Sequence, residues 1–134
     1  MTLDKETRES IVSYRLQKAK DTWREAYGNV KMGFWHTAAN RLYYSCYYAA
    51  SALLIKNGYS PKTHNGVLIL LGKHFVFEGI LSREQNELYL SLLDLRQESD
   101  YDDCLIVNEQ DVVPLVEPAQ KFIREMERLI NLKP

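Results

Sequence analysis

The sequence predicts an all-α protein, an up-and-down bundle of four to five helices that forms a single domain over residues 1–134. Three observations predict this fold. Apolar residues recur at helical intervals in several long segments. The segment Trp35–Asn57 has no Gly or Pro and is apolar or small on almost every face, which is typical of a helix in the middle of a bundle. The connections are short, so consecutive helices should be antiparallel neighbours.

A first helix is expected over residues 4–29, where a broad apolar stripe runs among Arg, Lys, Glu and Asp. Gly28, followed by an asparagine, favours a stop at its end. Either Thr7 or Ser10 could cap its beginning. The short connection over residues 30–33 makes this helix an antiparallel neighbour of the central one.

The central helix carries one charge, Arg41. A positive charge among tyrosines and small residues has to reach solvent, or meet a carboxylate or an anion. Small residues along this helix allow neighbouring helices to approach closely, and its tyrosines fill the wider gaps.

A third helix is expected through residues 67–76, after the central helix stops at Gly58. Thr63 or Asn65 could cap it. The apolar run VLILL at residues 67–71 is also compatible with a buried strand, because periodicity alone does not separate the two for so short a run.

The fourth helix should open at Ser82, which has the capping-box spacing to Gln85, and continue with leucines at helical intervals. It should weaken through residues 99–103, because three acids near a helix C-terminus oppose the macrodipole.

The last helix is expected over residues 109–132, with Asn108 as its cap and Asp111 at the third helical position. Pro118 removes a backbone donor, so it predicts either a kink or a true start nearer Glu117. The expected inward set is Val113, Val116, Ala119, Phe122, Ile123, Met126 and Ile130.

Composition describes an ordinary globular protein, with 46% hydrophobic and 26% charged residues. The formal net charge of -1 offers no global attraction for nucleic acid. Any nucleic-acid surface therefore has to be a local basic patch.

Nothing in the sequence suggests a membrane segment or a signal peptide, since the apolar runs are short and the N-terminus begins polar and acidic. We therefore expect a cytoplasmic protein. In that compartment Cys46 and Cys104 are expected to be free thiols, and two cysteines without clustered histidines make no zinc site.

Three tracts, in this order and spacing, resemble the HEPN superfamily, and most of all its small single-domain bacterial and archaeal members. They are residues 39–45 (ANRLYYS), residues 62–75 (with KTHNGV and GKHF) and residues 95–101 (LRQESDY). The resemblance spans about Trp35 to Met126. It implies a helical bundle that often dimerises and is frequently encoded beside a minimal nucleotidyltransferase as a toxin–antitoxin pair. Many members are metal-independent ribonucleases, whose site is an arginine followed a few residues later by a histidine, duplicated across the dimer.

Arg96 matches the family arginine, but Tyr101 stands where the histidine should be, and no histidine follows Arg96. An arginine can stabilise charge on a phosphate, yet it cannot exchange protons near neutral pH. Tyr101 is a poor general base with an ordinary pKa near 10, and Asp100 is a weak one. The candidate catalytic residues are therefore Arg96, Asp100 and Tyr101, in a degenerate site. Without the resemblance, the i, i+4 spacing of Arg96 and Asp100 favours a surface salt bridge over a functional site.

Basic and imidazole side chains elsewhere could bind a nucleotide or an RNA phosphate. The candidate binding residues are Arg96, Arg41, Lys62, His64 and Lys73. A solvated face is the simpler interpretation of the lysines and of His74, and a capping or core-edge role is the simpler one for His64. We expect no metal and no cofactor.

Three functions follow from these observations. One is a regulatory HEPN protein that binds a nucleotide or RNA phosphate at Arg96 without efficient cleavage. Another is a weak ribonuclease, and the third is a structural module that partners a nucleotidyltransferase. In each case a homodimer is expected, with Arg96 of each subunit near the two-fold axis.

Overall fold

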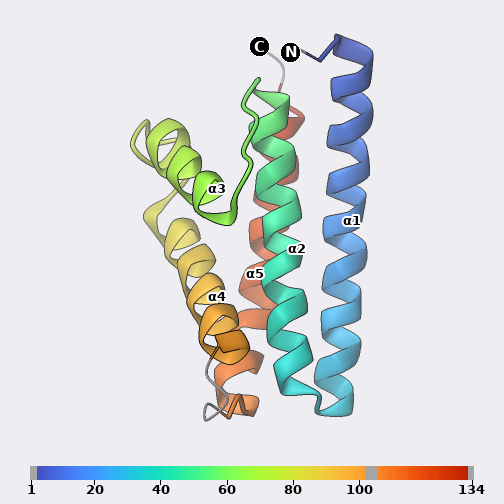
Figure 1. The fold of residues 1–134 in the computed structure, drawn as a ribbon, viewed down its shortest axis with the longest axis vertical. Coiled ribbons are helices and arrows are strands. Elements are labelled where there is room, and N and C mark those ends of the chain that lie inside the picture. Colours follow the sequence, from blue (N-terminus) through green and yellow to red (C-terminus); the bar gives the residue numbers. More distant parts are fainter. Residues whose placement is uncertain (1–2, 102–105, 133–134) are drawn as a thin grey trace.

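Four long helices run roughly alongside one another, and a short fifth helix packs at one end (Figure 1). The computed structural model describes residues 3–101 and 106–132, with side chains described up to residue 97 and again from 106. Within these ranges there are helices and no strand. They are α1 (Lys5–Met32), α2 (Trp35–Lys56), α3 (His64–Leu71), the π-helical turn η1 (Gly72–Val76), α4 (Arg83–Tyr101) and α5 (Glu109–Ile130).

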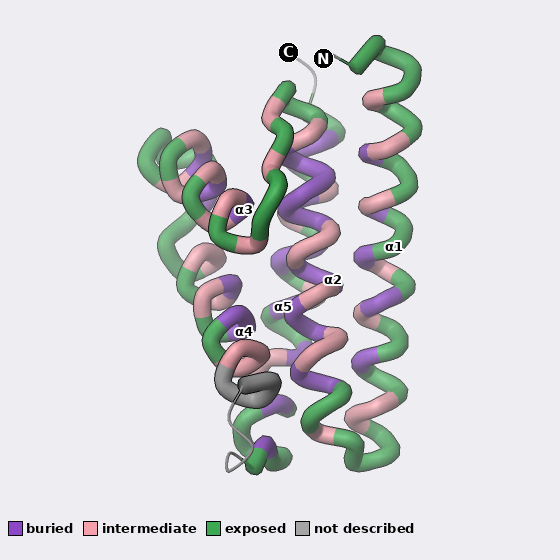
Figure 2. Tube along the Cα trace, in the orientation of Figure 1, coloured by how far each residue is buried: buried purple, intermediate pink, exposed green. Residues whose placement is uncertain are grey.

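The central position predicted for Trp35–Asn57 is confirmed, since α2 contacts α1, α3, α4 and α5. Its direction is opposite to those of α1 and α4 (Figure 1), so the up-and-down bundle is confirmed as well. Figure 2 shows buried positions along most of α2, whereas α1 is buried mainly on the side that faces the bundle.

The first helix is longer than expected and begins with a different cap. Asp4, and not Thr7 or Ser10, is the N-cap, because its carboxylate accepts a hydrogen bond of 2.7 Å from the Thr7 amide. The helix runs through Gly28 and ends at Met32. Gly33 adopts the left-handed conformation (φ 74°) that terminates a helix, which Gly28 does not. A lone glycine costs a long, packed helix only about 1 kcal/mol, so Gly28 does not stop it.

The run VLILL is helical, so the strand alternative is wrong. The Thr63 hydroxyl caps α3 by accepting a 2.8 Å hydrogen bond from the Gly66 amide. Val67 and Leu71 are buried, while Ile69 between them is 64% exposed. After α3 the helix changes to the wider π-helical turn η1, in which the Phe77 amide donates to the Gly72 carbonyl over 2.9 Å.

The fourth helix begins as expected, with the Ser82 hydroxyl accepting a hydrogen bond of 3.1 Å from the Gln85 amide. Tyr89 and Leu92 are fully buried on its inner side. The helix continues to Tyr101, inside the stretch over residues 99–103 where we expected it to weaken.

The Asn108 cap of the last helix is confirmed. It forms a capping box, in which Asn108 Oδ1 accepts from the Asp111 amide over 3.3 Å and Asp111 Oδ2 accepts from the Asn108 amide over 3.0 Å. This cap starts α5 at Glu109, so Pro114 and Pro118 both lie inside the helix and the later start near Glu117 is wrong. The register that follows from the cap also corrects the inward set. Val112 is fully buried, whereas Val113 is 42% exposed.

Burial raises the pKa of the Cys46 thiol to about 12, and its sulfur lies 3.6 Å from the Ala119 carbonyl oxygen. It is a free thiol, and Cys104 lies outside the described residues. Throughout the described ranges, no helix has both the length and the apolar character needed to cross a bilayer.

Candidate functional site

The site is built on four tyrosines of α2: Tyr43, Tyr44, Tyr47 and Tyr48. Spacings of one, three and four residues on a helix place them on one side of it. Neighbouring rings have centroids 5.1 to 6.0 Å apart, so the rings form one continuous surface. Tyr43 is fully buried and the other three are partly exposed. The aromatic surface therefore extends from the core to solvent, and we call it the tyrosine row.

His64 lies against the tyrosine row because the Thr63 cap makes it the first residue of α3. Its ring centroid is 4.6 Å from that of Tyr47, and 5.5 and 5.7 Å from those of Tyr43 and Tyr44. The Tyr43 hydroxyl and His64 Nδ1 are hydrogen-bonded at 2.6 Å. These contacts fix the orientation of the imidazole.

Arg96 reaches the same tyrosines from α4. Its guanidinium carbon lies 5.5 Å from the centroid of the Tyr43 ring and 5.4 Å from that of Tyr44. Arg41 approaches Tyr44 too, with its guanidinium carbon 5.3 Å from the ring centroid. The Arg41 Nε and Nη2 atoms donate to Asn40 Oδ1 over 3.2 and 2.9 Å. Asn40 is neutral, so these bonds orient the Arg41 charge without cancelling it.

Burial lowers the pKa of His64, and the positive charge of Arg96 lowers it further. The imidazole is therefore neutral at pH 7. Burial raises the pKa of Tyr43 to about 12, so its hydroxyl stays protonated. The positive charge at this site thus comes from the two arginines, and the aromatic faces partly stabilise it.

The hydrogen bond between the Tyr43 hydroxyl and His64 occupies Nδ1, so Nε2 is the nitrogen that can bind a ligand or exchange a proton with it. When the tyrosine hydroxyl donates to Nδ1, Nε2 carries the proton and can donate to an anionic oxygen. In the other tautomer, Nδ1 donates to the hydroxyl, and Nε2 has a lone pair that can accept a proton. One geometry thus serves either binding or proton transfer.

The structure brings three of the five candidate binding residues together, since Arg96, Arg41 and His64 all contact Tyr44. It does not place Lys62 or Lys73 there. Both are exposed, Lys62 just before α3 and Lys73 in η1.

Asp100 and Tyr101 belong to the last turn of α4, one turn beyond Arg96, and their side chains lie outside the described residues. His74 stacks on Tyr59 at 4.4 Å and is not part of the site. Among the residues that the structure describes, no group of three or more His, Cys, Asp or Glu side chains could hold a metal ion.

Sequence reasoning treated the tyrosines as packing residues and took His64 and Arg96 separately. The i, i+1, i+4 spacing of Tyr43, Tyr44 and Tyr47 was a usable signal, because it puts three phenols on one side of a helix. Their meeting with His64 and Arg96 depends on how α3 and α4 cross α2, and spacing along the chain does not contain that information.

Comparison with known proteins supports the fold and a family. The HEPN domain, as a sequence family, matches residues 12–129. A UPF0332 protein of Thermotoga maritima is 31% identical over 124 residues, which cover 92% of this chain and 94% of the relative. A Methanocaldococcus jannaschii protein named "Putative toxin MJ0142" is 26% identical over 118 residues, which cover 88% and 80%. The crystal structure of TT1696 from Thermus thermophilus superimposes with a TM-score of 0.76 at 18% identity, covering 88% of this chain and 97% of that one, and thus shares the fold.

Proposed function

This chain belongs to the HEPN family, and from that premise we propose that it binds a nucleotide or an RNA phosphate as the regulatory component of a toxin–antitoxin-like module. Two of its relatives are named "Putative toxin MJ0142" and "Putative toxin MJ0605". In this proposal α4 supplies a degenerate ribonuclease site, with Arg96 but without the histidine that would follow it.

The observation that carries the proposal is the meeting of Arg96, Arg41 and His64 around Tyr44. The two guanidinium carbons lie 5.3 and 5.4 Å from the centroid of the Tyr44 ring, and two positive groups beside one ring attract an anion. Phosphate is a suitable anion, because guanidinium groups donate paired, charge-assisted hydrogen bonds to its oxygens. Neutral His64 can add a third donor through Nε2.

Binding of a nucleotide or short unpaired RNA to wild type and Arg96→Ala tests this proposal. A lost charge-assisted hydrogen bond is worth about 1.5 to 3 kcal/mol, so the variant should bind roughly ten- to a hundredfold more weakly. Arg96→Lys keeps the charge but loses the planar fork, and should fall between the two. Arg83→Ala is the matched control, since it removes an exposed arginine from the same helix.

Equal affinity of wild type and Arg96→Ala would remove Arg96 from the site. It would favour the plain structural module, in which this arginine only stabilises the bundle.

A second candidate function, metal-independent RNA cleavage, is favoured by one observation: His64 lies beside the same tyrosines as Arg96. His64 could replace the missing α4 histidine. Its Nε2 takes the proton of a ribose 2′-hydroxyl, the 2′-oxygen attacks the adjacent phosphorus, and the bond to the 5′-oxygen breaks. That leaving oxygen takes a proton back from the imidazolium, and Arg96 stabilises the charge on the phosphorane.

Cleavage of short RNA in the presence of a chelator separates the two candidates. In the cleaving protein, His64→Gln should lower the rate by at least about a hundredfold, and a 2′-deoxy residue at the cut should block it. His74→Gln is the matched control. If wild type binds but does not cleave, the regulatory function is retained and the nuclease candidate is rejected.

The same proposal includes two protein partners, a second copy of the chain and a minimal nucleotidyltransferase. The family membership and the toxin names of relatives support these partners. Sedimentation at tens of micromolar should give a dimer. Co-purification with the product of a neighbouring nucleotidyltransferase gene would support the second partner.

A further inference from the structure

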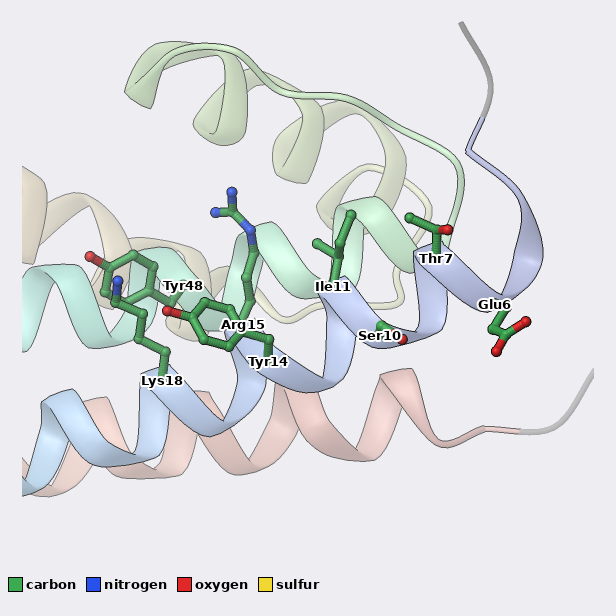
Figure 3. Close-up of a pocket in the computed structure, with 8 residues that line it drawn as sticks. All are labelled: Glu6, Thr7, Ser10, Ile11, Tyr14, Arg15, Lys18 and Tyr48. Atoms are coloured by element: carbon green, nitrogen blue, oxygen red, sulfur yellow. The ribbon is translucent and has the colours of Figure 1, made fainter.

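A surface groove between α1 and α2 carries a second group of aromatic and basic side chains (Figure 3). Tyr14, Lys18 and Tyr48 gather at one end of it, and Glu6 lies at the other. The Lys18 ammonium nitrogen is 4.8 Å from the centroid of the Tyr48 ring and 5.8 Å from that of Tyr14. Tyr14 is 65% exposed, so its ring is available to a ligand.

The basic side chains of this face have neutral partners. Arg15 Nη1 donates to the Ser51 hydroxyl over 3.2 Å, and Arg8 Nη1 donates to the Ile55 carbonyl over 3.0 Å. Within the described part of the chain, Lys18 makes no ion pair with a carboxylate. Glu6 is the one acidic residue that lines the groove, against two basic ones. The groove is therefore electropositive at its tyrosine end.

Contacts between aromatic rings link the groove to the Arg96 site. The Tyr48 ring lies 6.0 Å from that of Tyr44, over which Arg96 is placed. Arg15 also lines a neighbouring hollow that includes Tyr47, the tyrosine that packs on His64. A path of aromatic rings and cations thus runs from Tyr14 through Lys18, Tyr48 and Tyr44 to Arg96.

Such a path matches the chemistry of a single nucleic-acid strand. Unpaired bases stack on exposed aromatic rings, and the phosphates between them bind cations. A folded protein partner usually binds an apolar patch that has few charges at its centre, and this groove has charges there. We propose that the Tyr14, Lys18 and Tyr48 end of the groove binds an unpaired base and its phosphate, on a single RNA strand whose anchoring phosphate lies at Arg96 and Arg41. This inference rests on the proposed function in one respect, the anchoring phosphate at Arg96 and Arg41.

Two RNA probes test the inference: a dinucleotide, which fills only the Arg96 site, and an unpaired strand of about twelve nucleotides, which can reach the groove. Tyr14→Leu removes the ring and Lys18→Gln removes the charge, both at exposed positions where folding should be unaffected. Each should weaken binding of the long strand about tenfold and leave the dinucleotide unchanged. Lys18→Gln should also reduce the salt dependence of long-strand binding by about one counterion.

The chain offers a close control on the same helix. Lys31 lies 4.6 Å over the ring of Tyr27, which is also exposed, so this pair has the chemistry of Lys18 and Tyr14 but lies outside the groove. Tyr27→Leu should bind both probes as wild type does. An equal loss in Tyr27→Leu would mean that any surface tyrosine of α1 contributes, and it would overturn the inference.

The outcomes separate this inference from the proposed function. If Arg96→Ala weakens both probes while Tyr14→Leu and Lys18→Gln weaken neither, the groove is not a subsite and the proposed function stands. If Arg96→Ala weakens neither probe, the proposed function fails, and with it a strand that continues from Arg96. If the groove variants keep RNA affinity but shift the sedimentation of the protein alone, the groove is a contact between copies, which also overturns the inference.

Discussion

The alanines and the tyrosines of α2 differ in what they contact. Its alanines, including Ala38, Ala49 and Ala52, have no exposed surface and let helices approach closely. Its tyrosines range from the buried Tyr43 to the partly exposed Tyr48, and they contact charged side chains and an imidazole brought by other helices. The alanine positions serve the fold alone, whereas the tyrosine row both packs and presents polar groups.

This difference shows where function can be placed in a small helical bundle. A close-packed alanine position has no room for a ligand, and any added atom has to displace a helix. A tyrosine has a large apolar ring for the core and a hydroxyl at its tip for hydrogen bonds, so a row of them can support a site without opening a cavity.

The largest expected effect is on the alanine positions. Ala49→Phe places a ring where the exposed surface is zero, and overpacking should lower the free energy of unfolding by about 1 to 3 kcal/mol. Urea denaturation measures it. Thr37→Leu is the control, since it enlarges an exposed residue of the same helix and should change stability by less than about 0.5 kcal/mol. A tolerated Ala49→Phe would mean that the bundle is more loosely packed than the structure indicates.

The fold was predictable because its signals are local. The unbroken apolar segment of α2 and the Asn108 cap each specify a helix through a few neighbouring residues. The errors came where two local signals compete. Gly28 suggested a stop, but the left-handed backbone that ends the helix is that of Gly33. Pro118 suggested a break, but the cap at Asn108 and the packing of Val112 and Val116 start the helix earlier.

The candidate site was predictable only in its parts. Arg96, Arg41 and His64 were each candidates from their chemistry. Their common contact, Tyr44, depends on the way α3 and α4 cross α2, which follows from packing between elements far apart in the chain. The sequence motif after Arg96 pointed to Asp100 and Tyr101 on the same helix. The imidazole that shares a tyrosine with Arg96 is that of His64, which belongs to α3.

A smaller effect is expected from deleting one hydroxyl of the tyrosine row. Tyr43→Phe removes the hydrogen bond to His64 Nδ1 and should cost about 0.5 to 1.5 kcal/mol of stability. The control is Tyr48→Phe, because no hydrogen bond of the Tyr48 hydroxyl is present among the described residues, and its stability should be close to that of wild type. Equal losses in the two variants would mean that the bond with His64 contributes nothing specific.

The smallest effect should appear in the pH dependence of stability, and it tests whether the tyrosine row keeps His64 neutral. The imidazole faces Tyr43, Tyr44 and Tyr47 of α2 and the positive charge of Arg96 on α4, and its pKa is lowered in the folded state by burial and then by that charge. Between the folded pKa and the ordinary value near 6.5, the unfolded chain therefore binds more protons than the folded one.

It follows that His64 contributes a loss of stability as pH falls below about 6.5, which is complete once pH passes below the folded pKa. Because the ring is only partly buried, solvent screening keeps this loss modest. Urea denaturation of wild type and His64→Gln at pH 7.5 and about pH 5.5 measures it. Wild type should lose more stability on acidification than His64→Gln does. If the two proteins lose the same amount, the pKa of His64 stays near its ordinary value in the folded protein, and the imidazole becomes a third positive charge for the phosphate, beside Arg96 and Arg41, only below about pH 6.5.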